Sequence, residues 1–382
     1  MSRGKPSPCQ LGFSDAMLTA LADSGDCKTD AGFDTRNYGL PNGVPELSRI
    51  MAELLGVHEN EIVLGGNSSL TMMYDAVCRA MFFGTDSVSA PWKDQGTVKF
   101  LCPAPGYDRH FAITERFGIE MLPVPMTGHG PDMDMVEALA QSDAAVKGMW
   151  CVPKYSNPTG ETYSEETVRR IASLRPAAPD FRVFWDMAYA LHDLDSTPDE
   201  LLNIFALTRG TENENLVLGF FSTSKITYAG AGVAMMISGA DNVKRARAEI
   251  AYQTISPDKM NQLRHARYLA CADNVRALMR RHASVLKPKF DTVTRVFQKE
   301  FSDCGFASWT EPHGGYFLSL DVLPGTARRT VELCKNAGVT LTPAGSTYPY
   351  KRDPEDKNIR IAPSYPEIHE LETAMKVVLS LI

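Results

Sequence analysis

The alternation of short apolar segments with helix-like segments is the feature that most limits the fold of this chain. A first apolar segment covers 61–64, and the residues after it place apolar side chains at helical spacing from Leu70 to Met81. Further strands are expected near 98–101, 119–124, 146–152, 181–186, 216–221 and 232–237. Strands that alternate with helices are typical of a parallel sheet covered on both faces. The sequence therefore predicts an α/β fold with a mostly parallel sheet.

The pattern changes after Pro257, where the chain becomes helical and basic on one face. Pro288 lies inside a further helix-like segment and predicts a break or kink there. The apolar segments 315–320 and 358–362 predict strands of a smaller α+β domain. Arg360, in the second of them, is either a surface arginine or a receptor for a carboxylate. The expected domains are a large one over 36–284 and a small one formed by 1–35 together with 285–382.

The composition excludes several classes of protein. The 382 residues are 44% hydrophobic and 22% charged, which suits a globular protein of about two domains. The net charge of -7 argues against a nucleic-acid or anionic-membrane partner. No apolar stretch approaches the roughly 18 to 20 residues of a membrane span, and the first residues lack the apolar part of a secretory signal. The eight cysteines include no CxxC pair, so we expect reduced thiols in the cytoplasm and no metal site.

The apolar segment 216–221 ends in Ser222, Thr223, Ser224 and Lys225. Desolvation at the end of a buried strand lowers the pKa of a lysine. Such an amine is a nucleophile that can form a Schiff base with an aldehyde. Most lysines have no such role, so this interpretation depends on the residues that accompany Lys225.

A glycine- and hydroxyl-rich stretch, Gly65, Gly66, Asn67 and Ser68, separates the first strand from its helix. Free backbone N–H groups and the positive end of a helix dipole can bind phosphate at such a place. The stretch matches neither GxGxxG nor GxxxxGK[ST], which disfavours ATP binding and a nicotinamide-dependent dehydrogenase. Taken alone, it fits a plain helix cap with a tight turn better than a phosphate site.

Polar and aromatic side chains follow several of the predicted strands. Tyr107 lies just beyond one strand end, and Asn157 lies in a Ser-Asn-Pro-Thr-Gly turn after another. Asp186 ends a third strand, with Tyr189 three residues later. Ligands of open parallel sheets sit at the carboxyl ends of the strands, where Asn157, Asp186 and Lys225 all fall. The sequence therefore predicts one site at this edge of the sheet.

Taken in order, these patterns resemble the fold-type I pyridoxal-phosphate enzymes, and specifically the class I/II aminotransferases. The resemblance covers nearly the whole chain. The matching segments are 38–43 (Tyr-x-x-x-x-Gly), 65–68 (phosphate loop), 156–160 (Asn-Pro-x-Gly), 186–189 (Asp-x-x-Tyr), 222–225 (Ser-x-Ser-Lys) and 358–361 (late arginine motif). Segments 222–232 and 259–265 are similar in particular to a divergent subgroup of aspartate aminotransferases. The implied fold is a mostly parallel, seven-stranded sheet between helices, with a smaller α+β domain.

The resemblance implies that pyridoxal 5'-phosphate is the cofactor and assigns roles around it. Lys225 would hold the cofactor as a Schiff base and move the proton between the α-carbon of the substrate and the cofactor. Asp186 would keep the pyridine nitrogen protonated, so that the ring works as an electron sink. Tyr189 and Asn157 would hydrogen-bond the phenolic oxygen, and Tyr107 would stack on the ring.

The resemblance also implies how phosphate and substrate are held. The phosphate ligands would be Gly66, Asn67, Ser68, Ser222 and Ser224. Tyr38 would reach the phosphate of the neighbouring subunit, which implies a homodimer with a shared active site. Arg360 would bind the substrate α-carboxylate, together with Asn157 and the backbone N–H of Gly4.

The chain departs from the family at one place. Most relatives carry a phosphate-binding arginine in a Gly-x-Arg-x-Gly stretch after the lysine, but residues 228–233 contain no basic side chain. The phosphate charge must then be met by N–H groups, hydroxyls or a distant cation. A dicarboxylate substrate would need a second cation, for which Arg3, Lys5 and Arg36 are the candidates.

We therefore expect an aminotransferase that passes an amino group from an amino acid to a 2-oxo acid in a ping-pong reaction. Aspartate or glutamate with 2-oxoglutarate or oxaloacetate is the expected pair. A lyase or decarboxylase on the same fold stays open, because the reaction depends on which α-bond lies perpendicular to the ring. A non-catalytic sensor is disfavoured, since regulators of that kind carry a DNA-binding segment for which we expect no room before Tyr38.

Overall fold

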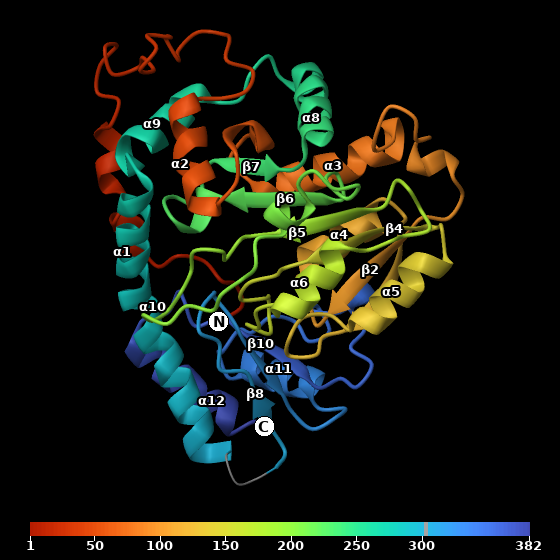
Figure 1. Cartoon of the computed structure of the whole chain (residues 1–382). Coiled ribbons are helices and arrows are strands. Elements are labelled where there is room, and N and C mark those ends of the chain that lie inside the picture. The colour runs from red at the N-terminus through yellow and green to blue at the C-terminus, as the bar shows by residue number, and fades with distance from the viewer. Residues whose placement is uncertain (302–304) are drawn as a thin grey trace.

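The computed structural model describes residues 1–301 and 305–382, which form a large sheet between helices and a smaller sheet beside it (Figure 1). The strands of the large sheet are β1 (Ile62–Leu64), β2 (Lys99–Ala104), β3 (Glu120–Pro125), β4 (Val146–Cys151), β5 (Arg182–Asp186), β6 (Val217–Ser222) and β7 (Ala234–Ile237). Their order across the sheet is β1-β7-β6-β5-β4-β2-β3. β7 runs antiparallel to both of its neighbours, and the other pairs are parallel. The predicted mostly parallel sheet is confirmed.

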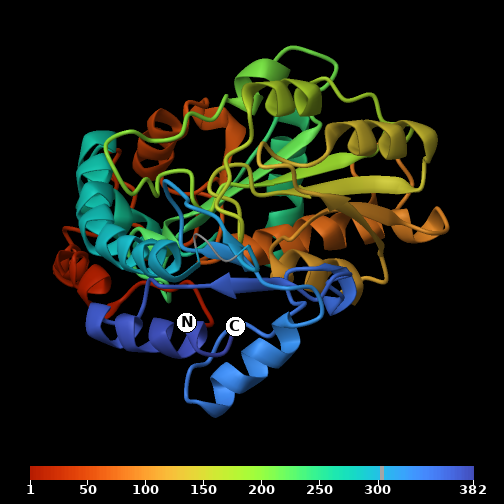
Figure 2. The same cartoon turned by 90° about the horizontal axis from the view of Figure 1, so that it is seen from below.

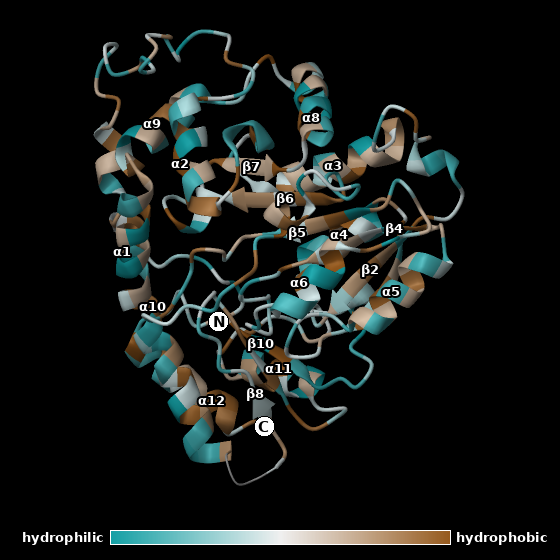
Figure 3. Ribbon diagram, viewed as in Figure 1, coloured by the Kyte–Doolittle hydropathy of each residue, from teal (hydrophilic) through white to brown (hydrophobic). Residues whose placement is uncertain are grey.

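Helices cover both faces of the large sheet. The helices on one face are α3 (Ser69–Phe83), α4 (Asp108–Arg116) and α8 (Ala240–Gln253). The helices on the other face are α2 (Pro45–Leu55), α5 (Met133–Ser142), α6 (Glu165–Ala172), α7 (Ile204–Thr208) and α9 (Lys259–Leu269). Side chains of β4, β5 and β6 enter the hydrophobic cores on both faces, which explains why these strands are nearly continuous apolar runs (Figure 3).

A second, antiparallel sheet contains β8 (Ser308–Trp309), β9 (Leu318–Asp321) and β10 (Asn358–Ile361). It shares a hydrophobic core with α11 (Ala327–Asn336) and α12 (Ile368–Leu379). Figure 2 shows both chain termini close to this sheet. The start of the chain is tied to it, because the Ala362 amide donates a hydrogen bond to the Met1 carbonyl (3.2 Å), and α1 (Pro8–Gly12) follows. This smaller unit confirms the predicted α+β part of the fold.

The long helix α10 (Ala272–Phe301) connects the two cores. Its first turns pack into the large-sheet core through Val275 and Leu278, and its later turns pack into the small-sheet core through Phe290 and Val293. Of the break or kink predicted at Pro288, the break is wrong, because the helix continues through this proline. Its direction does change along its length (Figure 1). The proline removes one backbone hydrogen bond, but packing on both sides preserves the helix.

The described residues contain neither a membrane-spanning helix nor a metal site. In that part of the chain, no helix is long and apolar enough to cross a bilayer. Nor does any group of histidine, cysteine and acidic side chains there have the geometry to hold a metal ion.

Candidate active site

The carboxyl ends of β4, β5 and β6 and the start of α3 surround a cavity of about 230 Å³. Asp186 is the last residue of β5, Lys225 lies in the short turn after β6, and Asn157 lies in the loop after β4. These strands are parallel neighbours, so their ends bring the three side chains to one cavity. The structure thus places together the residues that the sequence assigned to one edge of the sheet.

Lys225 carries the amine of this cavity. Its Nζ lies 4.8 Å from the centre of the Tyr189 ring. Burial lowers the pKa of the Lys225 ammonium, and the negative charge of Asp186 partly opposes the shift. A lowered pKa enlarges the neutral fraction of the amine at neutral pH, which is the form that attacks an aldehyde.

Asp186 is held in a fixed orientation. One carboxylate oxygen accepts a hydrogen bond from the Ala188 amide (3.0 Å), and the other lies 3.1 Å from His110 Nε2. The His110 ring stacks on Trp150 with 4.4 Å between the ring centres. The sequence interpretation missed His110. It lies three residues after Tyr107 at the start of α4, and this helical spacing was the available signal.

Two tyrosines and an asparagine complete the wall of the cavity. Burial raises the pKa of Tyr107 to about 12 and that of Tyr189 well above its usual value. Both phenols therefore keep their protons at neutral pH and can donate hydrogen bonds. Asn157 is buried, and its side-chain oxygen accepts a hydrogen bond from Arg360 Nη1 (3.1 Å). This contact links the cavity to the smaller sheet.

The start of α3 supplies a polar end to the cavity. The polar side chains at this end belong to Asn67, Ser68, Ser69, Ser222 and Ser224, of which Ser69 was not among the predicted site residues. Ser222 Oγ donates to Ser224 Oγ (3.1 Å), which in turn donates to the Asn67 carbonyl (3.2 Å). Gly66, the remaining predicted phosphate ligand, directly precedes Asn67 in the chain. α3 begins without a side-chain cap, so its first N–H groups are free to bind an anion. Lys225 is the basic side chain lining this cavity within the described ranges, so no arginine there takes the place of the missing one.

Tyr38 does not reach this cavity. It lies in the loop before α2 with 74% of its surface exposed, and it lines neither this cavity nor the larger one beside it. Its predicted contact with the phosphate of a neighbouring subunit stays a prediction.

A larger cavity of about 920 Å³ continues from this site to the smaller sheet. The two cavities share Tyr107, Asn157, Tyr189 and Lys225. Arg360 lies on the wall of the larger one and is 6% exposed. Its Nε donates to Thr342 Oγ1 (3.2 Å), and its Nη1 donates to both Asn157 Oδ1 and Asp108 Oδ1 (3.0 Å). Gly4 also lines this cavity, as predicted for a substrate contact.

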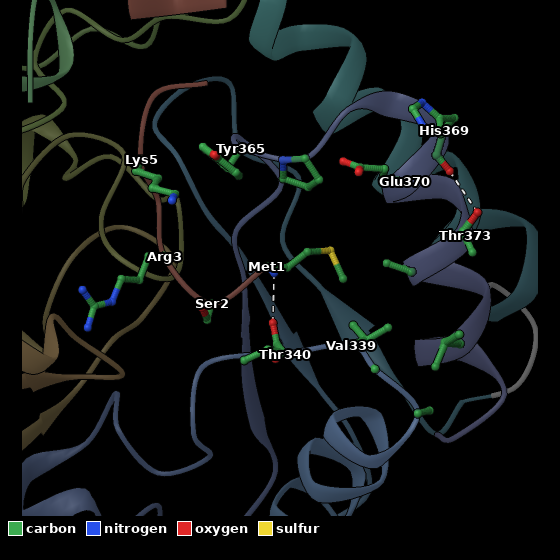
Figure 4. A pocket seen from close by; sticks show the side chains of 15 residues that line it. Met1, Ser2, Arg3, Lys5, Val339, Thr340, Tyr365, His369, Glu370 and Thr373 are labelled. Atoms are coloured by element: carbon green, nitrogen blue, oxygen red, sulfur yellow. Dashed lines mark hydrogen bonds between the residues drawn. The ribbon is translucent and has the colours of Figure 1, made fainter. Parts of the chain in front are cut away.

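The structure separates the three candidates for the second cation. Arg3 lines the larger cavity and also the edge of a separate one next to it, whereas neither Lys5 nor Arg36 lines the larger cavity. Arg36 forms an ion pair in an exposed loop, away from both cavities. The Lys5 ammonium lies 3.7 Å from the centre of the Tyr365 ring and lines a separate cavity of about 660 Å³. In Figure 4, Arg3 turns away from the α12 side chains that line this separate cavity.

The donor groups fit pyridoxal phosphate. An amine with a lowered pKa is available for its aldehyde, a carboxylate for its pyridine nitrogen, and hydroxyl and N–H groups at a helix start for its phosphate. The fold and this site together define a pyridoxal-phosphate-dependent enzyme of fold type I.

Comparison with known proteins identifies the family. Residues 1–382 match the family described as aspartate amino-transferase, and the chain belongs to it. It is 50% identical over 375 residues to the aspartate aminotransferase of Corynebacterium glutamicum, covering 98% of this chain and 86% of that relative. The crystal structure of an aspartate transaminase from the same species has a TM-score of 0.96 at 50% identity, covering 100% of this chain and 89% of the other.

A more distant structure shows how far the fold extends. An α-aminoadipate aminotransferase from Thermus thermophilus has a TM-score of 0.79 at 18% identity, covering 100% of this chain and 90% of the other. The family assignment confirms the resemblance that the sequence motifs indicated. The chain is an aminotransferase that uses pyridoxal phosphate.

Proposed function

We propose that the enzyme is an aspartate aminotransferase. It moves an amino group from aspartate or glutamate to 2-oxoglutarate or oxaloacetate in a ping-pong reaction. The observation that carries this proposal is that the amine of Lys225 lines both connected cavities, with the carboxylate of Asp186 on the wall of the smaller cavity and the guanidinium of Arg360 on the wall of the larger one. The name of the relative at 50% identity supports aspartate as the amino acid.

The cofactor is held from three directions in this proposal. Lys225 would hold its aldehyde carbon, and Asp186, oriented by His110, would keep its pyridine nitrogen protonated. Tyr107 would stack on the ring, and Tyr189 would donate a hydrogen bond to its phenolic oxygen. The start of α3 would hold the phosphate through Asn67, Ser68, Ser222 and Ser224, which line the cavity, and through Gly66, which precedes them in the chain.

Proton transfer is the task of Lys225. The bound cofactor supplies an electron sink for the electron pair that the α-carbon releases. Lys225 Nζ would move the proton between this carbon and the cofactor, which an amine of lowered pKa can do near neutral pH. Tyr189, whose ring lies 4.8 Å from Nζ, limits the directions in which the amine can move.

The substrate is oriented by its charged ends. Arg360 binds the α-carboxylate, assisted by Asn157 and by the backbone N–H of Gly4. Arg3 binds the distal carboxylate of a dicarboxylic substrate. Its guanidinium forms no ion pair with any described residue and lines the cavity that contains Lys225.

The active site is built from residues of two domains. A large domain over 36–284 carries the cofactor residues, and a small domain from 1–35 and 285–382 carries Arg360. The separate cores around the two sheets support this division.

A homodimer completes the site by bringing Tyr38 to the phosphate of the neighbouring subunit. Strongly exposed Tyr38, Tyr252 and Ile255 support such an interface. Sedimentation should show a dimer for the wild type and a monomer when Tyr252 and Ile255 are both changed to Glu. The cysteines described are all free, in keeping with a cytoplasmic enzyme.

Incubation with aspartate and 2-oxoglutarate tests the proposed reaction. Glutamate and oxaloacetate should appear in equal amounts. Release of ammonia or carbon dioxide without glutamate would instead identify a lyase or a decarboxylase.

A further inference from the structure

Arg360 already has a carboxylate partner from within the chain. Its Nη1 donates to Asp108 Oδ1 at 3.0 Å, in addition to Asn157. The arginine is 6% exposed, and the Phe317 ring lies 4.8 Å from its guanidinium carbon. An ionic hydrogen bond in such a partly dry place is strong, because little water competes with it. Asp108 therefore occupies a donor that a substrate carboxylate also needs.

The pair joins two distant parts of the fold. Asp108 is the first residue of α4, which follows β2 of the large sheet, and Arg360 lies in β10 of the small sheet. The two residues are 252 positions apart in the sequence. An acidic residue in the first turn of a helix is common, because it complements the helix dipole. That ordinary role does not explain why Oδ1 contacts a buried arginine across the cavity.

Two carboxylates cannot share this donor without cost. Like charges brought to one guanidinium repel each other, and a carboxylate that binds Arg360 bidentately needs an N–H group of Nη1 or Nε, both of which already have partners within the chain. Asp108 has a second cation nearby, since its Oδ2 lies 3.9 Å from Arg109 Nε. A small rotation of the side chain would exchange Arg360 for Arg109 and free the receptor.

We propose that Asp108 is a resident carboxylate that the α-carboxylate of the substrate displaces from Arg360. This inference rests on the proposed role of Arg360 as the carboxylate receptor. The exchange weakens binding of every carboxylate ligand by the free energy of the resident pair. It therefore sets the concentration range in which the enzyme responds to its substrates without touching the reacting atoms.

Calorimetric titration of the holoenzyme with succinate, at constant ionic strength, tests the exchange. Succinate carries two carboxylates and no amino group, so its binding is measured without turnover. Asp108→Asn keeps the shape of the side chain but removes its charge. It should bind succinate about tenfold more tightly, which corresponds to about 1.4 kcal/mol. The KM for aspartate should fall with it, while kcat changes little.

Glu115→Gln is the matched control. Glu115 lies on the same helix and lines the same cavity, and no contact joins it to Arg360. Glu115→Gln should leave both succinate binding and the thermal midpoint unchanged. Asp108→Asn should lower the thermal midpoint, because it removes the charged partner of a nearly buried arginine, but it should still unfold in one cooperative transition. Asp108→Ser provides a second route to the same result if the asparagine variant folds poorly.

The outcomes separate this inference from the proposed reaction. Unchanged or weaker succinate binding by Asp108→Asn, in a variant that still unfolds in one cooperative transition, would overturn the exchange and show that Asp108 only supports Arg360. Absence of glutamate formation by the wild type would overturn the proposed reaction, whereas the succinate titration would still report on Asp108.

Discussion

The two ends of the active-site cavity are assembled in different ways. At the cofactor end, Asn157, Asp186 and Lys225 each follow a strand of one sheet, so the neighbouring strands fix their positions. At the carboxylate end, Arg360 meets Asn157 and Asp108 from 203 and 252 positions away in the sequence. The first end depends on one sheet, and the second depends on how two sheets meet. Changes at the first end should therefore remove the chemistry, and changes at the second should alter affinity.

The largest effect is expected at Lys225. Lys225→Ala should lower kcat by about 10⁴-fold or more, because the group that moves the proton is lost. The variant should still bind the cofactor, which equilibrium dialysis can measure. Lys287→Ala, a change in an exposed i,i+4 pair on α10, is the matched control and should keep wild-type activity. Near-normal transamination by Lys225→Ala would contradict the role of this amine.

The next effect is expected at Arg360. Arg360→Gln removes a charged hydrogen-bond donor worth about 1.5–3 kcal/mol, so kcat/KM for aspartate should fall roughly 10- to 150-fold. Most of the loss should appear in KM if the carboxylate end governs affinity. A loss confined to kcat would remove the distinction between the two ends.

Acid should destabilise the packing around the turn that follows Lys225. Burial lowers the pKa of His265 to about 4, and this ring lies 2.9 Å from Thr227 Oγ1 in the turn after the lysine. Below the usual histidine pKa near 6.5, His265 is protonated in the unfolded chain but not in the folded chain. The free energy of unfolding therefore falls as the pH drops from about 6.5 to 4.

The loss at His265 should reach roughly 3 kcal/mol at pH 4, from the difference of about 2.5 pKa units. Urea unfolding at about pH 6.5 and about pH 4 measures this loss of stability. His265→Gln should remove this part of the pH dependence, whereas the exposed His369→Gln should not. Equal pH profiles for wild type and His265→Gln would refute the assignment.

The smallest effect separates the candidate cations of the carboxylate end. Arg3→Gln should lower kcat/KM for aspartate about tenfold through one lost ion pair, and should affect alanine much less. Lys5→Gln and Arg36→Gln should leave kcat/KM unchanged for both substrates, because their side chains lie outside the larger cavity. Equal losses for aspartate and alanine in Arg3→Gln would show that Arg3 does not read the distal carboxylate.

The same contrast explains what the sequence could predict. Lys225, Asp186 and Asn157 end strands, so local patterns were enough to place them at one edge of the sheet. His110 and Asp108 were missed because their partners are distant in the sequence and depend on how α4 packs. Local patterns also left three cations as equal candidates for the distal carboxylate, a choice that only tertiary contacts can narrow.

The helix around Pro288 shows the same limit. Its proline predicts a break or a kink, and α10 is not broken because it packs against both cores. Packing of this kind is not visible in a local pattern.

Borohydride reduction of the holoenzyme, followed by peptide mass spectrometry, tests the central claim most directly. Reduction fixes the cofactor to the amine that holds it. The peptide that contains Lys225 should carry the added phosphopyridoxyl mass. Its appearance on another lysine, such as Lys154 beside Asp193, would contradict the account.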